Sequence, residues 1–192
     1  AGEFRVIAAR ENEHEYYIDH RNGQLFIRTN DRGRNFRLVT APVDAPERAN
    51  WVERIAHREA IMLEDFDLFA NFFVACEREY GLPRLRMWQF QDQSAEANPA
   101  GEIAFPEPAY NASPGINRIW ETELFRYGYQ SLVTPGSVLE YDIYTHESKL
   151  LKQQEVPGGF DRALYASERV HAVASDGVQV PISLVYRRDK FE

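Results

Sequence analysis

Few residues in this sequence could do chemistry, and they are scattered. His14 and His20 flank a short alternating segment and would share a face if that segment is a strand. At roughly 3.3 Å of extended chain per residue, they are too far apart to hold one metal ion, so we expect two polar surface residues. Cys76 lies in the alternating run Phe72–Arg78 (FFVACER), with no obvious activating neighbour. We interpret it as a small buried hydrophobe.

An acidic cluster occupies one expected strand, Met62–Phe69 (MLEDFDLF), and comprises Glu64, Asp65 and Asp67. Paired carboxylates can act as acid and base only when both face the same site. Side chains alternate along a strand, so Glu64 and Asp67 are expected on opposite faces. We therefore interpret the cluster as a solvated edge or the lining of a channel.

A nucleophile motif is also missing. Hydrolases of the α/β class present their serine in a Gly-x-Ser-x-Gly turn, supported by a histidine and an aspartate. The 192 residues contain no such pattern, and Gly136-Ser137 lacks the flanking glycine. We assign no catalytic, cofactor-binding or metal-binding residue and expect no cofactor.

Short alternating runs separated by turn residues make up most of the chain and predict an all-β protein. Asn22-Gly23 is typical of a tight hairpin turn, because glycine accepts positive φ at little cost. The runs fall into three groups of four. The expected strands are 14–20, 24–29, 36–40 and 51–56; then 62–69, 72–78, 85–90 and 102–105; then 120–126, 129–133, 138–144 and 149–152.

Groups of four strands that recur every 40 to 50 residues are typical of β-propeller blades. Each blade buries its faces only against neighbouring blades. A β-sandwich also has short strands at regular spacing, so strand pattern alone leaves both folds open. In a propeller, Phe4–Ala8 would be the outer strand of a preceding blade.

A further hairpin is expected at Tyr165–Arg188, where two alternating runs flank Ser175-Asp176-Gly177. It follows a break at Pro157-Gly158-Gly159 and resembles the start of a new domain. The sequence ends soon afterwards at Glu192 and opens without a methionine. We expect it to be part of a larger protein.

Composition excludes several classes of function. The net charge of −8 argues against a nucleic-acid partner, because phosphate binding needs clustered Lys and Arg. No apolar stretch approaches the roughly 18 residues of a membrane span, and no signal peptide is evident. A single cysteine allows no internal disulfide and fits a reducing compartment, so we expect a cytoplasmic protein.

Several segments in the last third of the chain form a recognisable set. They are 125–135 (FRYGYQSLVTP), 149–158 (KLLKQQEVPG), 165–169 (YASER) and 176–186 (DGVQVPISLVY), and looser similarities at 14–16, 35–38 and 62–64 follow the same order upstream. In Arg126–Tyr129 (RYGY), Gly128 suggests a bulge or a close backbone approach, with the flanking aromatic residues packing between blades. Together these segments resemble the prolyl oligopeptidase family of serine peptidases, and within it the oligopeptidase B branch.

The resemblance implies a seven-bladed propeller that caps an α/β-hydrolase domain and filters substrates by size. Residues 1–160 would be about three C-terminal blades, and 161–192 the linker and first strands of the catalytic domain. The partners would be oligopeptides with Lys or Arg at the cleavage site and the missing hydrolase domain. The catalytic triad would lie beyond the chain, leaving this polypeptide inactive by itself. The alternatives are a stand-alone propeller-like binding module and a β-sandwich module.

Overall fold

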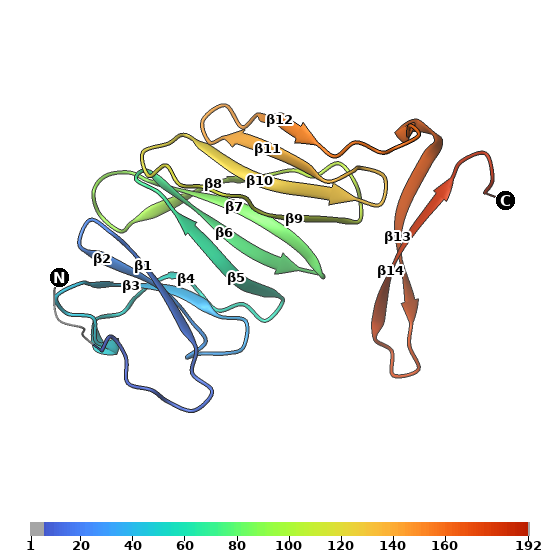
Figure 1. The fold of residues 1–192 in the computed structure, drawn as a ribbon. Helices are drawn as coiled ribbons and strands as arrows, with labels where there is room; N and C mark the ends of the chain where they lie inside the picture. The colour runs from blue at the N-terminus through green and yellow to red at the C-terminus, as the bar shows by residue number, and fades with distance from the viewer. Residues whose placement is uncertain (1–5, 192) are drawn as a thin grey trace. The chain divides into compact units, whose positions relative to one another are not determined.

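A computed structural model describes residues 6–191. Within that range the regular structure consists of three four-stranded antiparallel sheets, a two-stranded hairpin and two short 3₁₀ helices (Figure 1). In each four-stranded sheet, the strands lie side by side in the order of the sequence. This confirms the expected all-β fold of blade-like sheets.

The first sheet agrees closely with the expected strands. Asn22 and Gly23 join β1 to β2 with φ of 48° and 74°, so both residues of this turn adopt the left-handed conformation. The 3₁₀ helix η1 (Arg48–Asn50) lies between β3 and β4. The strands are β1 (Tyr16–Arg21), β2 (Gln24–Thr29), β3 (Arg37–Pro42) and β4 (Val52–Ile55).

The second sheet differs from expectation only in its last strand. The sequence favoured a loop over 91–100 and a strand over 102–105, but β8 comprises the polar stretch ANPAGE. Pro99 is tolerated there because an edge strand has one side free of ladder hydrogen bonds. The strands are β5 (Ile61–Leu68), β6 (Phe72–Glu79), β7 (Leu82–Phe90) and β8 (Ala97–Glu102).

The third sheet corrects two expectations. The runs 120–126 and 129–133 do not form two strands, because one continuous strand passes through Gly128 without a turn. The first strand, with the loop-like sequence YNASP, was missed; its pairing with the next strand holds it extended. The strands are β9 (Tyr110–Pro114), β10 (Leu124–Ser131), β11 (Ser137–Asp142) and β12 (Ser148–Gln153).

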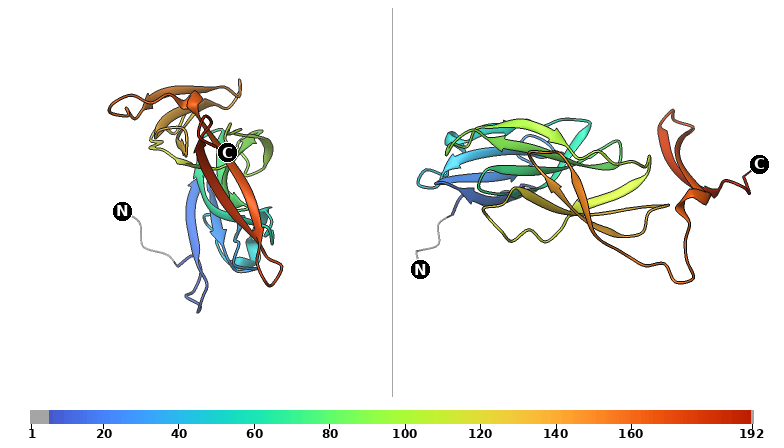
Figure 2. Two further views of the ribbon diagram at one scale, coloured as in Figure 1. Left: turned by 90° about the vertical axis from the view of Figure 1, so that its right-hand side faces the viewer. Right: turned by 90° about the horizontal axis from the view of Figure 1, so that it is seen from above.

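The C-terminal hairpin consists of β13 (Tyr165–Val173) and β14 (Gln179–Arg187), and the short helix η2 (Arg162–Leu164) precedes it (Figure 2). Gly177 in the connecting loop has φ of 85°. This confirms the expected hairpin. Of the strand expected at Phe4–Ala8, residues 4 and 5 lie outside the described residues, and Val6–Ala8 are not in a strand.

The chain divides into two compact units. The first comprises residues 1–102 and 118–123, and the second residues 103–117 and 124–192. In the first unit, a single apolar cluster joins the first two sheets, with Phe26 in β2 against Phe73 and Phe90 of the second sheet. The ring centroids of Phe26 and Phe90 are 5.7 Å apart in an edge-on arrangement. Each sheet thus covers a face of the other.

Arg21 links the same two sheets at the end of β1 and is 2% exposed. Its guanidinium donates to the carbonyl oxygens of Ala70 at 2.7 Å, Asp92 at 2.8 Å and Ser94 at 2.5 Å. It also lies 3.8 Å above the ring of Phe90. One side chain therefore satisfies three carbonyls in two loops of the second sheet.

We expect Arg21→Met to lower the free energy of unfolding by about 2–4 kcal/mol, because three carbonyls lose a charged donor. Denaturant unfolding of the protein would measure this loss. Arg32→Met is the matched control, since that side chain is 66% exposed and should change stability by less than about 0.5 kcal/mol. Equal stability of the two variants would contradict this role of Arg21.

Candidate functional site

The first strands of the sheets are the best candidates for a functional surface in this chain. In the first unit, β5 contacts both β1 and β2, so the two sheets come closest at their first strands. Each first strand ends its sheet and has one edge without a strand partner. Side chains in the middle of β1 are exposed, including Tyr17 and Ile18.

The acidic cluster lies on one of these strands, but its geometry differs from expectation. The pairing of β5 with β6 shifts between Leu63 and Asp65, which makes Glu64 the extra residue of a β-bulge. Leu63 and Phe66 are consequently both buried, although they are three residues apart. The acidic side chains Glu64, Asp65 and Asp67 all lie on the less buried side. The expectation that Glu64 and Asp67 face opposite ways was wrong, because a bulge breaks strict alternation.

Two of these carboxylates have defined roles. Arg78 donates from Nε and Nη2 to the oxygens of Glu64 at 2.6 and 3.1 Å, which makes a bidentate ion pair. Asp65 accepts from the backbone N–H of Phe66 at 2.9 Å and is exposed. Because Glu64 is held by Arg78, it does not form a free acid–base couple with a neighbour.

Cys76 lies directly across the strand pair from Asp65 and is 6% exposed. Burial, together with the charges of Asp67 and Asp65, raises the pKa of its thiol well above the ordinary value. The thiolate needed for nucleophilic chemistry is therefore disfavoured. The interpretation of Cys76 as a small buried hydrophobe is confirmed.

His14 and His20 have separate surroundings and separate partners. His14 lies before the start of β1 and is not part of the strand. Its Nε2 atom lies 2.9 Å from Thr29 Oγ1. His20 is in β1, with a side chain that is 75% exposed beside Asp19. Within residues 6–191, no group of three or more His, Cys, Asp and Glu side chains is arranged to hold a metal ion.

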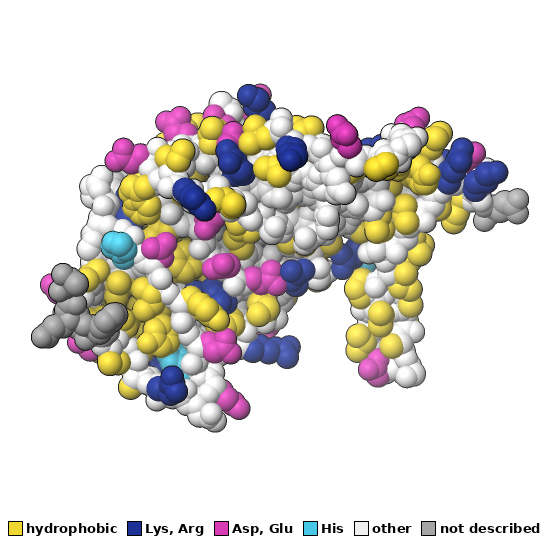
Figure 3. All heavy atoms as spheres, in the orientation of Figure 1, with side chains coloured by type: hydrophobic (Ala, Val, Ile, Leu, Met, Phe, Trp, Pro, Cys, Tyr) yellow, Lys and Arg dark blue, Asp and Glu magenta, His cyan; other side chains and the backbone are white. Residues whose placement is uncertain are grey.

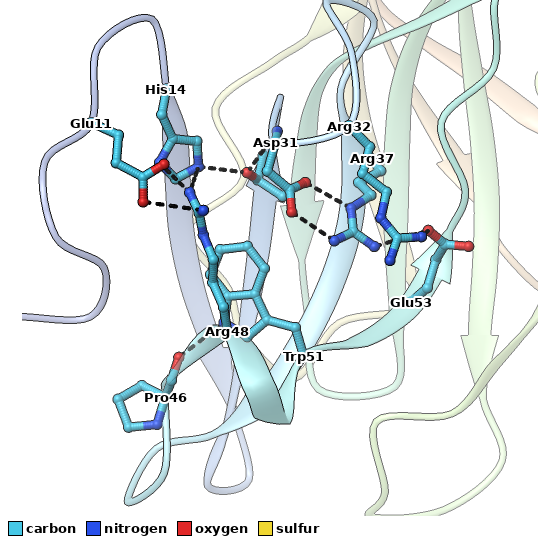
Figure 4. A network of polar contacts seen from close by, with 10 residues as sticks. Glu11, His14, Asp31, Arg32, Arg37, Pro46, Arg48, Trp51 and Glu53 are labelled. Atoms are coloured by element: carbon cyan, nitrogen blue, oxygen red, sulfur yellow. Dashed lines mark hydrogen bonds and ion pairs between the residues drawn. The ribbon is translucent and has the colours of Figure 1, made fainter.

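A polar network surrounds His14 at one end of the first sheet (Figure 4). Arg48 donates to His14 Nδ1 at 2.9 Å, pairs with Glu11 at 3.1 Å and lies over the ring of Trp51. The neighbouring Arg37 holds Asp31 through two hydrogen bonds of 2.8 Å.

The Arg37–Asp31 pair is largely buried, with side chains 6% and 12% exposed. Burial alone would raise the pKa of Asp31, but the hydrogen bonds and charge of Arg37 outweigh it and lower that pKa below its ordinary value of 3.8. Hydrogen bonding to Asp31 likewise raises the pKa of Arg37. Arg37 also donates to Glu53 at 3.0 Å and so links β3 to β4.

Sequence analysis missed two buried carboxylates. Glu77 is 1% exposed and is held between Arg58 and Arg86. Burial alone would lower the pKa of Arg86, but its hydrogen bonds to Glu79 and Glu77 raise it. Nothing in the run CERE distinguishes the buried Glu77 from the exposed acids of other strands.

The second missed carboxylate, Glu107, belongs to the other unit and is 7% exposed. It accepts from Thr134 Oγ1 at 2.7 Å and pairs with Arg162, which belongs to η2. This pair ties the loop before β9 to the segment that leads into the C-terminal hairpin. Its role is therefore structural.

Gly128 does not have the special geometry expected of it. It pairs regularly with Val138 on one side and Ser113 on the other, and the bulge in this sheet lies between Val138 and Leu139. A Cβ atom at Gly128 would lie 3.7 Å from Ser113 Oγ, which is an ordinary contact. Its aromatic neighbours Tyr127 and Tyr129 are buried, and Tyr129 stacks on Phe105 with centroids 5.3 Å apart.

No helix within residues 6–191 is long and apolar enough to cross a membrane. The repeated four-stranded antiparallel sheets, of which the first two share one apolar core, are typical of blades of a β-propeller. Residues 1–154 match the family described as prolyl oligopeptidase, N-terminal beta-propeller domain. The chain belongs to this family of peptidases.

Several relatives are similar over nearly the whole chain. Dipeptidyl aminopeptidase BI of Pseudoxanthomonas mexicana is 40% identical over 190 residues, which cover 98% of this chain and 25% of the relative. Protease 2 of Moraxella lacunata is 28% identical over 172 residues, covering 89% of this chain and 24% of the relative.

One similar solved structure is oligopeptidase B from Trypanosoma brucei, in a closed form with covalently bound antipain, with a TM-score of 0.83. It is 29% identical in sequence, and the match covers 97% of this chain and 27% of that structure's chain. Oligopeptidase B from Leishmania major has a TM-score of 0.82 and 28% identity over 95% of this chain and 26% of its own. This chain thus spans about a quarter of the length of its relatives. The resemblance inferred from the sequence is confirmed at the level of the family.

The lowered pKa of Asp31 predicts an acid-sensitive first sheet. A carboxyl whose pKa is depressed in the folded state stabilises the protein above pH 3.8, and this contribution is lost as the pH falls further. Asp31→Asn should lower the free energy of unfolding by about 1–3 kcal/mol at pH 7 and reduce its dependence on pH below about 4.

Denaturant unfolding at several pH values would test this prediction. Asp19→Asn is the matched control, because the Asp19 side chain is 50% exposed on β1. An Asp31→Asn variant with the same pH profile as the unmodified protein would contradict the role of the pair.

Proposed function

We propose that residues 1–160 of this chain are propeller blades of a serine-type oligopeptidase that cleaves short peptides after Lys or Arg. The observation that carries the proposal is the family match over residues 1–154 together with similarity to peptidases over nearly the whole chain. The preference for basic residues is supported by the likeness to oligopeptidase B at 28–29% identity.

The role of this portion would be to admit peptides and exclude folded proteins. The unpaired edges and exposed side chains of the first strands support it, because in a propeller these strands line the central channel. The carboxylates gathered on one side of β5 would favour basic peptides electrostatically.

Residues 161–192 would be the linker and first strands of the catalytic domain. The hairpin has one apolar face, formed by Val170 and Ala172 of β13 opposite Ile182 and Val180 of β14. These valines and Ile182 are 39–44% exposed, and hydrophobic side chains are prominent along the hairpin in the space-filling view (Figure 3). An isolated two-stranded hairpin is only marginally stable in water, so we expect another part of the protein to pack against this apolar face. The catalytic Ser, His and Asp would belong to that covering domain.

A second candidate is removal of dipeptides from the N-terminus of peptides. The specific support is the 40% identity to a dipeptidyl aminopeptidase, which exceeds the 28% to Protease 2. Both candidates are peptidases, and they differ in whether a free N-terminus is required.

The full-length gene product that carries this sequence should cleave an N-terminally blocked arginyl substrate, and a serine-directed inhibitor should abolish that activity. A substrate with Glu in place of Arg should be cleaved at least about tenfold more slowly, because carboxylates that favour a basic side chain repel an anionic one. The two proposed activities are separated by measuring kcat/KM on three substrates. These are the blocked arginyl substrate, its Glu analogue and a dipeptide substrate with a free N-terminus.

Cleavage of the dipeptide substrate with a free N-terminus, without cleavage of the N-terminally blocked arginyl substrate, would favour dipeptide removal and contradict the first candidate. Activity that survives the serine-directed inhibitor would overturn the serine-type mechanism. A length series of peptides, compared with the same sequence inside a folded protein, would test the size filter independently.

The proposed packing of the catalytic domain against the apolar face of the hairpin gives a separate prediction. In the full-length gene product, Ile182→Asp should destabilise the protein by about 2–4 kcal/mol, because it buries a charge beneath the covering domain. Ser183→Asp is the matched control, since Ser183 is exposed on the opposite face, opposite Arg169. Equal melting temperatures for the two variants would contradict this assignment.

A further inference from the structure

Arg28 lies where the first two sheets come together. It belongs to β2, is 7% exposed and faces the second sheet, where its Nη1 donates to the carbonyl oxygen of Leu63 at 3.1 Å. Its partner across the strand pair is Tyr17 of β1. The guanidinium is therefore almost enclosed, directly behind a first strand.

The guanidinium has fewer acceptors than its burial requires. Of its five N–H groups, only one on Nη1 has a described hydrogen bond, and the buried Nε has no partner. A buried donor without a partner costs about 1–3 kcal/mol, and more when it is charged. Burial accordingly lowers the pKa of Arg28, and nearby Asp65 is the strongest charge that opposes this effect.

Aromatic rings hold the group in place. The Arg28 Cζ atom lies 4.4 Å from the ring centroid of Tyr17 and 4.0 Å from that of Phe36. Phe36 adopts φ of 58°, a conformation that is rare for an aromatic residue and carries strain. The stacking fixes the guanidinium without satisfying its hydrogen bonds, so the side chain keeps its capacity to donate.

The exposed neighbours are suited to a peptide. Tyr17 is 52% exposed, so its ring offers an open apolar surface. Asp65 is exposed on β5, and no ion pair is described for it; the carboxylates of Glu15 and Glu64 also act on Arg28. Arg28 binds the carbonyl oxygen of Leu63, which is two residues before Asp65 on β5, and lies against the ring of Tyr17 on β1. Hydrogen-bond donor, ring and carboxylate thus lie along the first strands of the two sheets.

We propose that Arg28, Tyr17 and Asp65 form a docking site for an extended peptide with a basic side chain. Arg28 donates to a peptide carbonyl oxygen, Tyr17 packs against the chain, and Asp65 pairs with the Lys or Arg side chain. This inference rests on the peptidase function proposed above and adds a binding step on the propeller itself. β1 and β5 each have one edge without a strand partner, which main-chain pairing with an extended chain requires. At Leu63 the edge of β5 is already used, because its N–H donates to the carbonyl oxygen of Asn35 at 2.9 Å and its carbonyl oxygen accepts from Arg28.

Fluorescence anisotropy on the full-length gene product tests the site. The probes are two fluorescein-labelled octapeptides of Ala and Gly, one with a single Arg and one with a single Glu at the same position. The protein is first treated with a serine-directed inhibitor wherever cleavage occurs. Arg28→Met should weaken binding of both peptides about tenfold, because each loses a charged hydrogen bond to the main chain. Asp65→Asn should weaken only the Arg peptide, by about threefold to tenfold.

The controls are Arg32→Met and Asp19→Asn, which remove exposed charges of the first sheet and should leave binding unchanged. Arg28→Lys should restore part of the affinity, and circular dichroism would confirm that each variant is folded. Asp65→Asn remains decisive if Arg28→Met fails to fold, because Asp65 is exposed.

Unchanged affinity in Asp65→Asn for both peptides, or an equal loss in the controls, would overturn the site. Absence of binding by the unmodified protein would overturn it as well. Failure of the proposed function is a separate result, namely no cleavage of any peptide, and the anisotropy measurement does not depend on cleavage.

Discussion

The packing of one sheet against the next is the constraint on which the rest of this structure depends. A four-stranded sheet has two faces and cannot bury either alone, so Phe26 of the first sheet and Phe73 of the second complete one shared core. At 25 cal/mol per Å², burial of such side chains contributes about 1.5–3 kcal/mol each. Polar groups at the margin of that core must then find partners across the sheet boundary, which explains why Arg21 binds carbonyls of the second sheet and Arg28 the carbonyl of Leu63.

The arrangement of the first strands follows from the same constraint. Because the shared core draws the first strands together, β1 and β5 present their free edges and polar side chains side by side. The bulge at Glu64 keeps Leu63 and Phe66 in the core while it turns three carboxylates to one side. Ion pairs such as Arg78–Glu64 and Arg37–Asp31 then fix the strands at the margins.

Alternating patterns and turn residues predicted most strands of the first two sheets, because β-propensity and tight turns are local properties. The Asn22-Gly23 turn is an example. The misses share one cause: β8 and β9 have polar, proline-containing sequences that become strands only by pairing with β7 and β10. Likewise, no local signal reveals the bulge at Glu64, the burial of Glu77 and Glu107, or the regular pairing of Gly128. Those features depend on residues that are distant in sequence.

By itself, the sequence determined the all-β class, the repeat of four strands, the C-terminal hairpin and the resemblance to the prolyl oligopeptidase family. Each of these depends on residue order within short segments, where period-two patterning and turn chemistry act directly. Only the tertiary structure decided that Arg28 is enclosed between Tyr17 and Phe36, that Asp65 lies near it, and that His14 and His20 have separate surroundings. These relations arise from sheet packing, which brings together side chains that no local pattern connects.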